Sequence, residues 1–441
     1  MEKRFRIGNI VISLEFVAKF TAVVVAGLLF LRDIGGVGIS SLMVTVIVFI
    51  AFMLLDYEHV CCLTLFLVPF ISGISAGRVM LLASIFLLIK SKRIKLSQIF
   101  MICFVVFMEL YASRWYPDPN HAEIFPYLAC SAVLFLMILL DYDIDYRKCV
   151  MFYYIGIVAA IGISLIGSVA SGGLTASTLV SSRGHIGGYL VSVDGARLSF
   201  NANTYAYYCI AGITCGFVLM KNTKLANMRK LIMILTYMLL FAGVFSVSRT
   251  FLLVASLCLF LYVISETDNV KRIVKFGLLI LIILIAGIYI METNSAIINA
   301  WVFRFTGEDI ETGGQRVTLF QQYMDVFWSN ERLQWFGAGV TQYRGVTHVY
   351  NSMHNSLQQI LICFGIPGCI LYLIALASPI LKMRKDKIPL LYWLPFIGCV
   401  IFLQSIQFLN PCMFIPTYVV CVYALRLGRD AKKNEKIYNY S

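Results

Sequence analysis

The chain alternates between long apolar runs and short polar connections. The runs are about 15–25 residues long, the length that a helix needs to cross roughly 30 Å of hydrocarbon. This pattern predicts an all-α polytopic membrane protein that forms a single integral membrane domain over residues 1–441, with about fourteen transmembrane helices and twelve as the alternative count. The predicted spans are approximately 10–31, 38–55, 59–75, 77–90, 97–113, 124–141, 149–170, 203–220, 231–248, 250–265, 274–291, 354–381, 389–408 and 411–426.

Composition supports this class, because 60% of the 441 residues are hydrophobic and only 13% are charged, whereas soluble domains carry about 25% charged residues. The first run follows the basic segment MEKRFRIGN and is expected to be a retained helix. Inside it, Glu15 and Lys19 lie one helical turn apart, and their pairing would lower the cost of insertion. The thirteen cysteines fall mostly in apolar runs without a CxxC pair, which predicts neither a disulfide framework nor a zinc site.

The distribution of lysine predicts the orientation of the chain. If the N-terminus is cytoplasmic, the clusters KSKRIK at 90–95, KNTKLANMRK at 221–230 and KMRKDK at 382–387 all lie on the cytoplasmic side. Every lysine except Lys19 then falls inside or at an inner helix end, as the positive-inside rule requires. Both termini are therefore predicted to be cytoplasmic, and the net charge of +13 reflects orientation and not a nucleic-acid surface.

The outer side carries arginines but no lysine. Arginine keeps its charge and binds phosphate with two parallel hydrogen bonds, so the set favours an anionic, phosphate-bearing ligand on the outer face. Scattered surface arginines remain the alternative. The outer arginines are Arg32, Arg78, Arg114, Arg183, Arg197, Arg249, Arg304, Arg316, Arg332 and Arg344.

Two outer loops are long, at about 171–202 and 292–353, and loops of this length are usually functional or disordered. The second contains an amphipathic helix at about 314–328 that is expected to lie on the membrane surface. Arg316 falls in its first turn, where the helix dipole disfavours a cation unless an anion binds there as well. A solvated arginine is the alternative. The apolar face comprises Leu319, Phe320, Tyr323, Met324, Phe327 and Trp328.

Two further outer segments carry polar residues beside apolar runs. VDGARLSFNANTYAYY places Arg197 and Asn203 just before a span, where Asn203 either caps the helix or binds a ligand. FSVSRTFLL places Arg249 between two apolar runs, where a charge costs about 2.5–3.5 kcal/mol at membrane depth. Arg249 is therefore either functional or extended towards the outer interface.

His354 and Asn355 stand at the mouth of the span 354–381. Asn355 or Ser356 is expected to cap this helix, with Gln358 or Gln359 completing a capping box. Capping does not explain His354, whose imidazole is suited to accept a proton near neutral pH. Upstream, WFGAG at 335–339 predicts a tight turn but no nucleotide-binding loop.

Taken in order, these motifs resemble those of the O-antigen ligase and Wzy-type O-antigen polymerase superfamily of bacterial membrane polysaccharide glycosyltransferases. The resemblance covers about residues 193–375. Its C-terminal part reads as an arginine, a GxG turn, then HN before a helix with G-I-x-G. The residues that carry it are Arg197, Asn203, Ser248-Arg249, Arg316, Gly337-Ala338-Gly339, His354-Asn355 and Gly365-Ile366-Pro367-Gly368.

The resemblance implies a GT-C-like fold and a metal-independent glycosyltransferase that needs no cofactor. Such enzymes act at the outer, periplasmic or extracellular face of the cytoplasmic (inner) membrane and transfer glycan from undecaprenyl pyrophosphate to an acceptor hydroxyl. A polymerase joins lipid-linked repeat units into O-antigen of lipopolysaccharide or into capsular or exopolysaccharide, with a chain-length regulator as a further partner. A ligase transfers glycan to lipid A–core. A flippase for lipid-linked oligosaccharide is the rival of a different class, and would place charges near the midplane and show internal repeats.

The resemblance also assigns roles to the candidate residues. Arg197, Arg249 and Arg316 would stabilise the departing pyrophosphate, with Asn203 and Asn355 binding substrate. His354 would act as the base or orient the acceptor hydroxyl. Direct displacement would invert the anomeric centre, whereas a double displacement needs an outer carboxylate. Both stay open, because the outer carboxylates include Asp194, Glu308, Asp309, Glu311 and Asp325.

Overall fold

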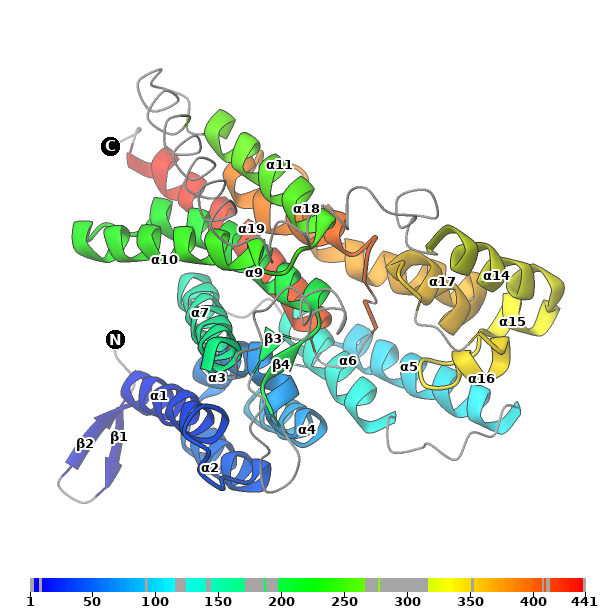
Figure 1. Ribbon diagram of the computed structural model, residues 1–441, viewed down its shortest axis with the longest axis horizontal. Coiled ribbons are helices and arrows are strands. Elements are labelled where there is room, and N and C mark those ends of the chain that lie inside the picture. Colours follow the sequence, from blue (N-terminus) through cyan, green and yellow to red (C-terminus); the bar gives the residue numbers. More distant parts are fainter. Residues whose placement is uncertain are drawn as a thin grey trace.

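The computed structural model is predominantly helical, with two small antiparallel ribbons (Figure 1). It describes residues 4–7, 10–91, 94–115, 124–139, 144–170, 186–187, 197–265, 277, 316–349, 353–406, 408–409 and 413–438.

The helices follow the apolar runs along the chain. The first part contains α1 (Leu14–Asp33), α2 (Ser41–Leu54), α3 (Tyr57–Leu67), the 3₁₀ turn η1 (Val68–Gly73), α4 (Ala76–Lys90), α5 (Leu96–Trp115), α6 (Ile124–Ile138) and α7 (Tyr146–Ala170). The second part contains α9 (Ala202–Asn222), α10 (Ala226–Val244), α11 (Arg249–Ser265), α14 (Arg316–Ser329), α15 (Glu331–Phe336), α16 (Tyr343–Thr347), α17 (Ser356–Lys382), η4 (Leu390–Trp393), α18 (Leu394–Phe402) and α19 (Phe414–Tyr438).

Each predicted span that the structure describes overlaps at least one helix, and the predicted span 274–291 lies outside the described residues except for residue 277. Within the described part, four helices are long and apolar enough to cross a membrane by themselves: α1, α7, α10 and α17. Several other apolar helices are shorter, at 10–17 residues, so the count of fourteen spans stays a prediction.

The expected start of the first span was wrong. Residues 10–13 form strand β2 (Ile10–Ser13), which pairs antiparallel with β1 (Arg4–Ile7). The sequence explains this, because two short alternating segments flank a Gly-Asn pair, which is typical of a two-residue hairpin connection. Helix α1 then begins where the Ser13 side chain accepts a hydrogen bond from the Phe16 N–H at 3.2 Å.

The predicted pairing inside α1 is confirmed. Lys19 Nζ lies 2.6 Å from Glu15 Oε1, and Lys148 Nζ from α7 lies 3.1 Å from Glu15 Oε2. The carboxylate of Glu15 is thus neutralised by two cations, one of them on another helix.

Helix α9 is the centre of the bundle, since nearly every residue from Ala202 to Leu219 is buried. It packs against α7, α10, α11 and α18. Glycine allows the close approach, because a Cβ atom at Gly216 would lie 2.2 Å from Thr236 Oγ1 on α10. Small residues at contacts are the usual way for membrane helices to pack, since lipid offers no hydrophobic driving force between them.

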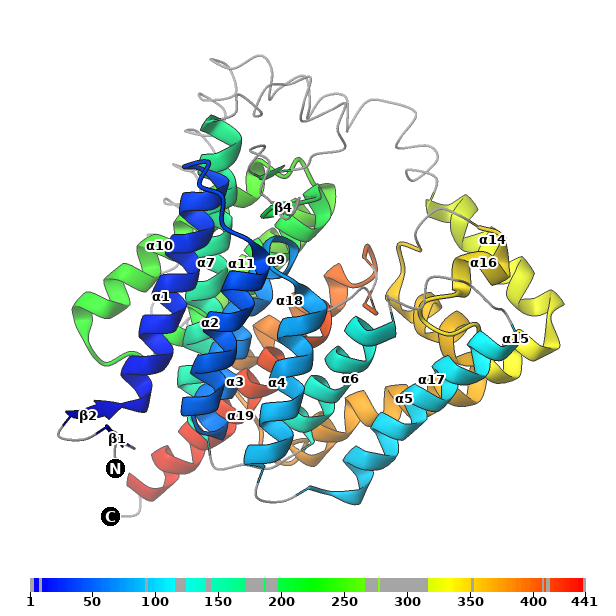
Figure 2. The same ribbon diagram turned by 90° about the horizontal axis from the view of Figure 1, so that it is seen from below.

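The bundle has two distinct ends and a lateral extension (Figure 2). The hairpin β1–β2 and the C-terminal end of α19 lie at one end, while strand β4 (Ser199–Phe200), which pairs with β3 (Ile186–Gly187), lies at the other. Helices α5 and α14–α17 extend to one side of the bundle. The first and last described segments of the chain thus lie at the same end of the bundle, and their cytoplasmic placement stays a prediction.

Candidate active site

The turn between α10 and α11 carries Ser248 and Arg249. The Ser248 Oγ accepts a hydrogen bond from the Phe251 N–H at 3.4 Å, and so caps α11. It also donates to Asn203 Oδ1 on α9 at 3.4 Å. Arg249, the first residue of α11, is partly exposed beside this contact. The structure therefore brings Asn203 to Ser248, the residue before Arg249, although 45 residues separate Asn203 from Ser248.

The backbone of this turn is strained at Val247, which has φ of 48°. Positive φ is a genuine outlier for a β-branched residue and costs on the order of 1–3 kcal/mol. Strained backbone of this kind is concentrated at functional sites, so the turn that presents Arg249 is a candidate for one.

The expectation that Asn203 caps α9 was wrong. The cap is Asn201, whose Oδ1 accepts a hydrogen bond from the Thr204 N–H at 2.8 Å. The capping residue directly precedes the first helical residue, whereas Asn203 already lies in the first turn of α9. Its side chain is left to bind Ser248, or a ligand.

The start of α11 is joined to the turn that follows α18, where the hydroxyls of Thr250 and Ser405 lie 3.1 Å apart. The same turn meets the start of α17, because Asn355 Nδ2 donates to Gln404 Oε1 at 3.3 Å. These contacts connect Arg249 with His354-Asn355 through residues 404–405. The polar starts of α9, α11 and α17 thus converge at one place.

Asn355 caps α17 as predicted, accepting a hydrogen bond from the Gln358 N–H at 3.0 Å. The predicted capping box was wrong, because both glutamines bind other segments. Gln359 Oε1 accepts from the Leu409 N–H at 2.8 Å, and Gln358 Nε2 donates to the Phe320 carbonyl at 2.8 Å. His354 directly precedes this cap and is partly exposed, so it stands next to the fixed start of α17.

Helix α14 begins at Arg316, so a helix with its arginine in the first turn occupies the stretch predicted to be amphipathic, and its place on the membrane surface stays a prediction. Gln358 of α17 holds the carbonyl of Phe320, one turn further along α14. One turn of helix rises about 5.4 Å. Arg316 therefore lies one turn from the point where α14 contacts the start of α17.

The apolar face of α14 is divided. Tyr323 and Phe327 are buried, whereas Phe320 and Trp328 are exposed. The Tyr323 hydroxyl donates to the Val349 carbonyl at 2.9 Å, and burial raises the pKa of this phenol above its ordinary value. Tyr323 thus remains a hydrogen-bond donor that ties α14 to the segment leading to His354.

The GxG turn and the G-I-P-G sequence form one backbone contact. The N–H groups of Ala338 and Gly339 donate to the carbonyls of Ile362 and Cys363, both at 2.9 Å. The helix leaves the Cys363 carbonyl free because its partner four residues later is Pro367, which has no N–H. The turn therefore satisfies acceptors that α17 cannot satisfy itself.

Glycine is required on both sides of this contact. Gly365, with φ of 66°, breaks α17, and a Cβ atom there would lie 2.7 Å from the Gln334 carbonyl oxygen. A Cβ atom at Gly337, with φ of 71°, would lie 2.3 Å from the Cys363 carbonyl oxygen. These motif residues position the loop before His354.

Glu109 on α5 is a site residue that our reading of the sequence missed. It is 2% exposed, and its carboxylate accepts hydrogen bonds from the Val340 N–H at 2.6 Å, the Thr341 N–H at 2.9 Å and the Thr341 hydroxyl at 2.6 Å. A carboxylate inside the predicted span 97–113 was the available signal, because such residues are usually functional. Glu109 holds the turn that follows the GxG motif.

Arg197 is exposed, and a buried ion pair fixes the backbone next to it. The Arg32 guanidinium binds Asp33 Oδ1 at 2.7 Å and the Gly73 carbonyl at 2.7 Å. Asp33 Oδ2 in turn accepts from the Leu198 N–H at 2.9 Å. Arg32 was grouped with the outer arginines that favour an anionic ligand. It is 2% exposed, and with Asp33 it anchors the strand that leads from Arg197 to α9.

The remaining predicted residues lie on other helices or outside the described part of the chain. Asp325 is exposed on α14, and Arg78 and Arg332 lie near helix starts. The positions outside the described residues are Arg183, Asp194, Arg304, Glu308, Asp309 and Glu311, together with the side chain of Arg114.

A comparison with known protein families tests the predicted resemblance. Residues 233–373 match the family described as O-antigen ligase. The matched segment contains Arg249, Arg316 and His354, together with the GxG turn and the break at Gly365. The predicted resemblance to the O-antigen polymerase and ligase superfamily is confirmed for this part of the chain. No curated protein matches the sequence.

The family points to glycan processing at a membrane by a glycosyltransferase-like protein with lipid-linked glycan substrates. Five of the six predicted site residues lie on or beside the starts of α9, α11, α14 and α17. Asn203, Arg249, His354 and Asn355 belong to the starts of α9, α11 and α17, which are linked by hydrogen bonds. Arg316 lies one helical turn from the contact between α14 and α17. Arg197 lies on the strand that enters α9.

Proposed function

We propose that this protein is a polysaccharide polymerase that joins undecaprenyl-pyrophosphate-linked repeat units at the outer leaflet of the cytoplasmic membrane. The observation that carries the proposal is the convergence of the polar starts of α9, α11 and α17, two of which lie within the matched segment. The contacts among these helix starts support a single site to which Asn203, Arg249 and His354-Asn355 all contribute.

The reaction forms one bond and breaks one. The acceptor hydroxyl oxygen attacks the sugar C1, and the bond from C1 to the pyrophosphate oxygen breaks, with its electron pair leaving on the pyrophosphate. The hydroxyl proton passes to His354. General-base help of this kind is worth roughly 10²–10⁴-fold in rate.

The arginines stabilise the negative charge that develops on the pyrophosphate in this step. Arg249 and Arg316 face the leaving pyrophosphate, whose negative charge grows towards the transition state, so they stabilise the transition state more than the bound donor. Arg197 and the amides of Asn203 and Asn355 hold the phosphate and sugar hydroxyls. The undecaprenyl chain lies against the apolar helices.

A ligase is the second candidate, because the matched family is described by that activity. It would use the same donor and the same residues, but its acceptor would be lipid A–core. A gel of the glycan from a deletion strain separates the two. Loss of a polymerase leaves single repeat units, whereas loss of a ligase leaves full-length polymer on the carrier lipid.

Arg316 tests the proposed chemistry against a matched control. Arg316→Ala is expected to abolish polymer formation while the protein reaches the membrane in normal amount. Arg332→Ala removes an exposed arginine from the adjacent helix α15 and should leave polymer yield unchanged. Equal loss in the two variants would contradict a specific role for Arg316.

A further inference from the structure

The turn that follows α18 lies outside the matched segment 233–373, in a stretch that the sequence assigned to the predicted span 389–408. The structure ends α18 at Phe402, and residues 403–406 form a turn. The sequence QSIQ at 404–407 explains the early end, because polar side chains are costly to bury in hydrocarbon. This turn contacts the polar starts of both α11 and α17 in the candidate active site.

Close contacts fix the turn on the start of α17. The N–H and the hydroxyl of Ser356 both donate to the Leu403 carbonyl, at 3.1 Å and 2.7 Å. The Ser356 Oγ also lies 2.8 Å from the carbonyl oxygen of Ile406. Leu403, Ser405 and Ile406 are all buried. The backbone of the turn is therefore held in one position relative to the helix start.

Gln404 is the exposed residue of this turn, between buried Leu403 and Ser405. Its Oε1 accepts a hydrogen bond from Asn355 Nδ2 at 3.3 Å, and its Nε2 donates to the Val400 carbonyl at 3.5 Å. Both bonds are longer than the usual N–H···O distance of about 2.9–3.0 Å. A primary amide has two N–H groups and two lone pairs. Within the described part of the chain, Gln404 thus keeps one N–H and one lone pair for a ligand.

The contacts of the turn place this amide beside the groups of the proposed reaction. Asn355, which Gln404 binds, directly follows His354. The hydroxyl of Ser405 lies 3.1 Å from that of Thr250, at the start of α11. A molecule bound to Gln404 therefore lies next to the segment that carries the proposed base.

The remaining donor and acceptor of Gln404 match sugar hydroxyls. A hydroxyl both donates and accepts hydrogen bonds, so two neighbouring hydroxyls can use the N–H and the Oε1 together. A pyrophosphate oxygen only accepts, and it would leave the Oε1 of the amide without a partner. The chemistry of Gln404 therefore favours the glycan part of the substrate over its phosphates.

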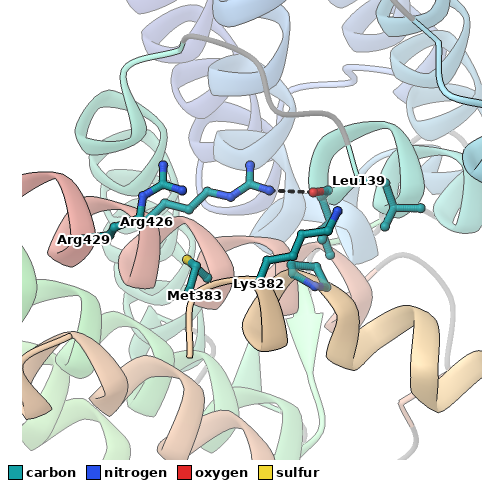
Figure 3. A pocket seen from close by; sticks show the side chains of 7 residues that line it. Leu139, Lys382, Met383, Arg426 and Arg429 are labelled. Carbon is teal, nitrogen blue, oxygen red and sulfur yellow. Dashed lines mark hydrogen bonds between the residues drawn. The ribbon is translucent and has the colours of Figure 1, made fainter. Parts of the chain in front are cut away.

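The cavity shown in Figure 3 offers different chemistry. It lies at the C-terminal end of α17, between α6, α17 and α19, and its volume is about 60 Å³. Ligand pockets usually have roughly 300–1,000 Å³. The polar side chains that line the cavity are Lys382, Arg426 and Arg429, which donate hydrogen bonds but do not accept them. This cavity suits a sugar less well than the amide beside the start of α17.

We propose that Gln404 is a further substrate-binding residue, which holds two neighbouring hydroxyls of the acceptor sugar through its remaining N–H and its Oε1. The proposal rests on the proposed function, because it needs a glycan acceptor next to His354. These bonds form with the acceptor before and during the reaction alike. They are therefore expected to lower KM and to select the acceptor, and to leave kcat nearly unchanged.

The test follows polymer formation by the purified full-length protein. Its substrates are the undecaprenyl-pyrophosphate-linked repeat unit of the host and analogues in which hydrogen replaces one hydroxyl of the acceptor sugar, other than the attacking one. Gln404→Ala removes the donor and the acceptor. Gln404→Glu keeps an oxygen that accepts from Asn355 but has no N–H. Gln322→Ala is the matched control, because Gln322 is exposed on α14.

Gln404→Ala should raise KM by on the order of 10-fold with little change in kcat, because it removes two hydrogen bonds to the acceptor. For the wild type, one analogue should raise KM by about 3-fold, and the same analogue should cause no further rise in Gln404→Ala. Gln404→Glu should not restore the KM of the wild type, and Gln322→Ala should match it.

Three results would overturn the proposal. Gln404→Glu with wild-type KM would show that Gln404 only orients Asn355. A lower kcat with unchanged KM in Gln404→Ala would have the same meaning. Wild-type kinetics in Gln404→Ala, with an active wild-type protein, would overturn this inference alone. A wild-type protein that makes no polymer from the repeat unit would instead overturn the proposed function, and this inference with it.

Discussion

Glu109 offers a sharp test of how the loop before His354 is held. Its carboxylate accepts three hydrogen bonds from Val340 and Thr341. Glu109→Ala would leave two backbone N–H groups without their acceptor, at about 1–3 kcal/mol each, so we expect a loss of about 2–6 kcal/mol in the free energy of local unfolding. Glu109→Gln keeps the shape but replaces one acceptor oxygen with a donor, and should lose at least one charge-assisted bond of about 1.5–3 kcal/mol.

The assay compares thermal stability in detergent with polymer formation for the two variants. Glu331→Gln is the control, because that carboxylate is exposed on the nearby helix α15. Stability should fall in the order wild type, Glu109→Gln, Glu109→Ala, with the control close to wild type, and polymer formation should fall in parallel. If Glu109→Gln kept full stability but lost polymer formation, the carboxylate would act in the chemistry and the anchoring explanation would be refuted.

Two further variants test the supports of the site. Asp33→Asn breaks a buried pair whose side chains are 1% exposed, and should cost about 3–5 kcal/mol and reduce polymer yield. Asp430→Asn, in a partly exposed Arg-Asp pair of the same spacing, should cost no more than about 1 kcal/mol. A similar melting temperature for both would contradict the buried anchor. Gly365→Ala places a side chain at positive φ against the Gln334 carbonyl, at about 1–2 kcal/mol for the backbone alone, whereas Gly345→Ala meets open space and should melt like wild type. An unchanged melting temperature for Gly365→Ala would show that the contact of the GxG turn with α17 is unimportant.

Hydrophobic periodicity predicted most of the helices, because bilayer thickness and backbone hydrogen bonding leave an apolar run few other conformations. It failed at residues 10–13, where a short alternating segment forms a strand. It also did not predict the break at Gly365, which depends on the GxG turn satisfying the freed carbonyls.

Some of the polar site residues could be predicted from the sequence, and others could not. Arg249, Arg316 and Asn355 occur in local motifs, and the structure places them at helix starts. Asn203 and Asn201 differ by two positions, and only the helix boundary tells which one is the cap. Glu109 escaped because its partners are more than 230 residues away, and local sequence carries no information on such a contact.

His354 separates catalysis from folding most directly, because it precedes the cap of α17 while Asn355 makes the capping bond. The measurement is polymer formation by purified protein supplied with undecaprenyl-pyrophosphate-linked repeat units, with His354→Ala beside His348→Asn. His348 is exposed in the same outer segment at φ of 55°, a conformation that asparagine tolerates. The account predicts that His354→Ala makes no polymer while folding normally and that His348→Asn makes polymer like wild type. Polymer of near wild-type length and yield from His354→Ala would contradict it.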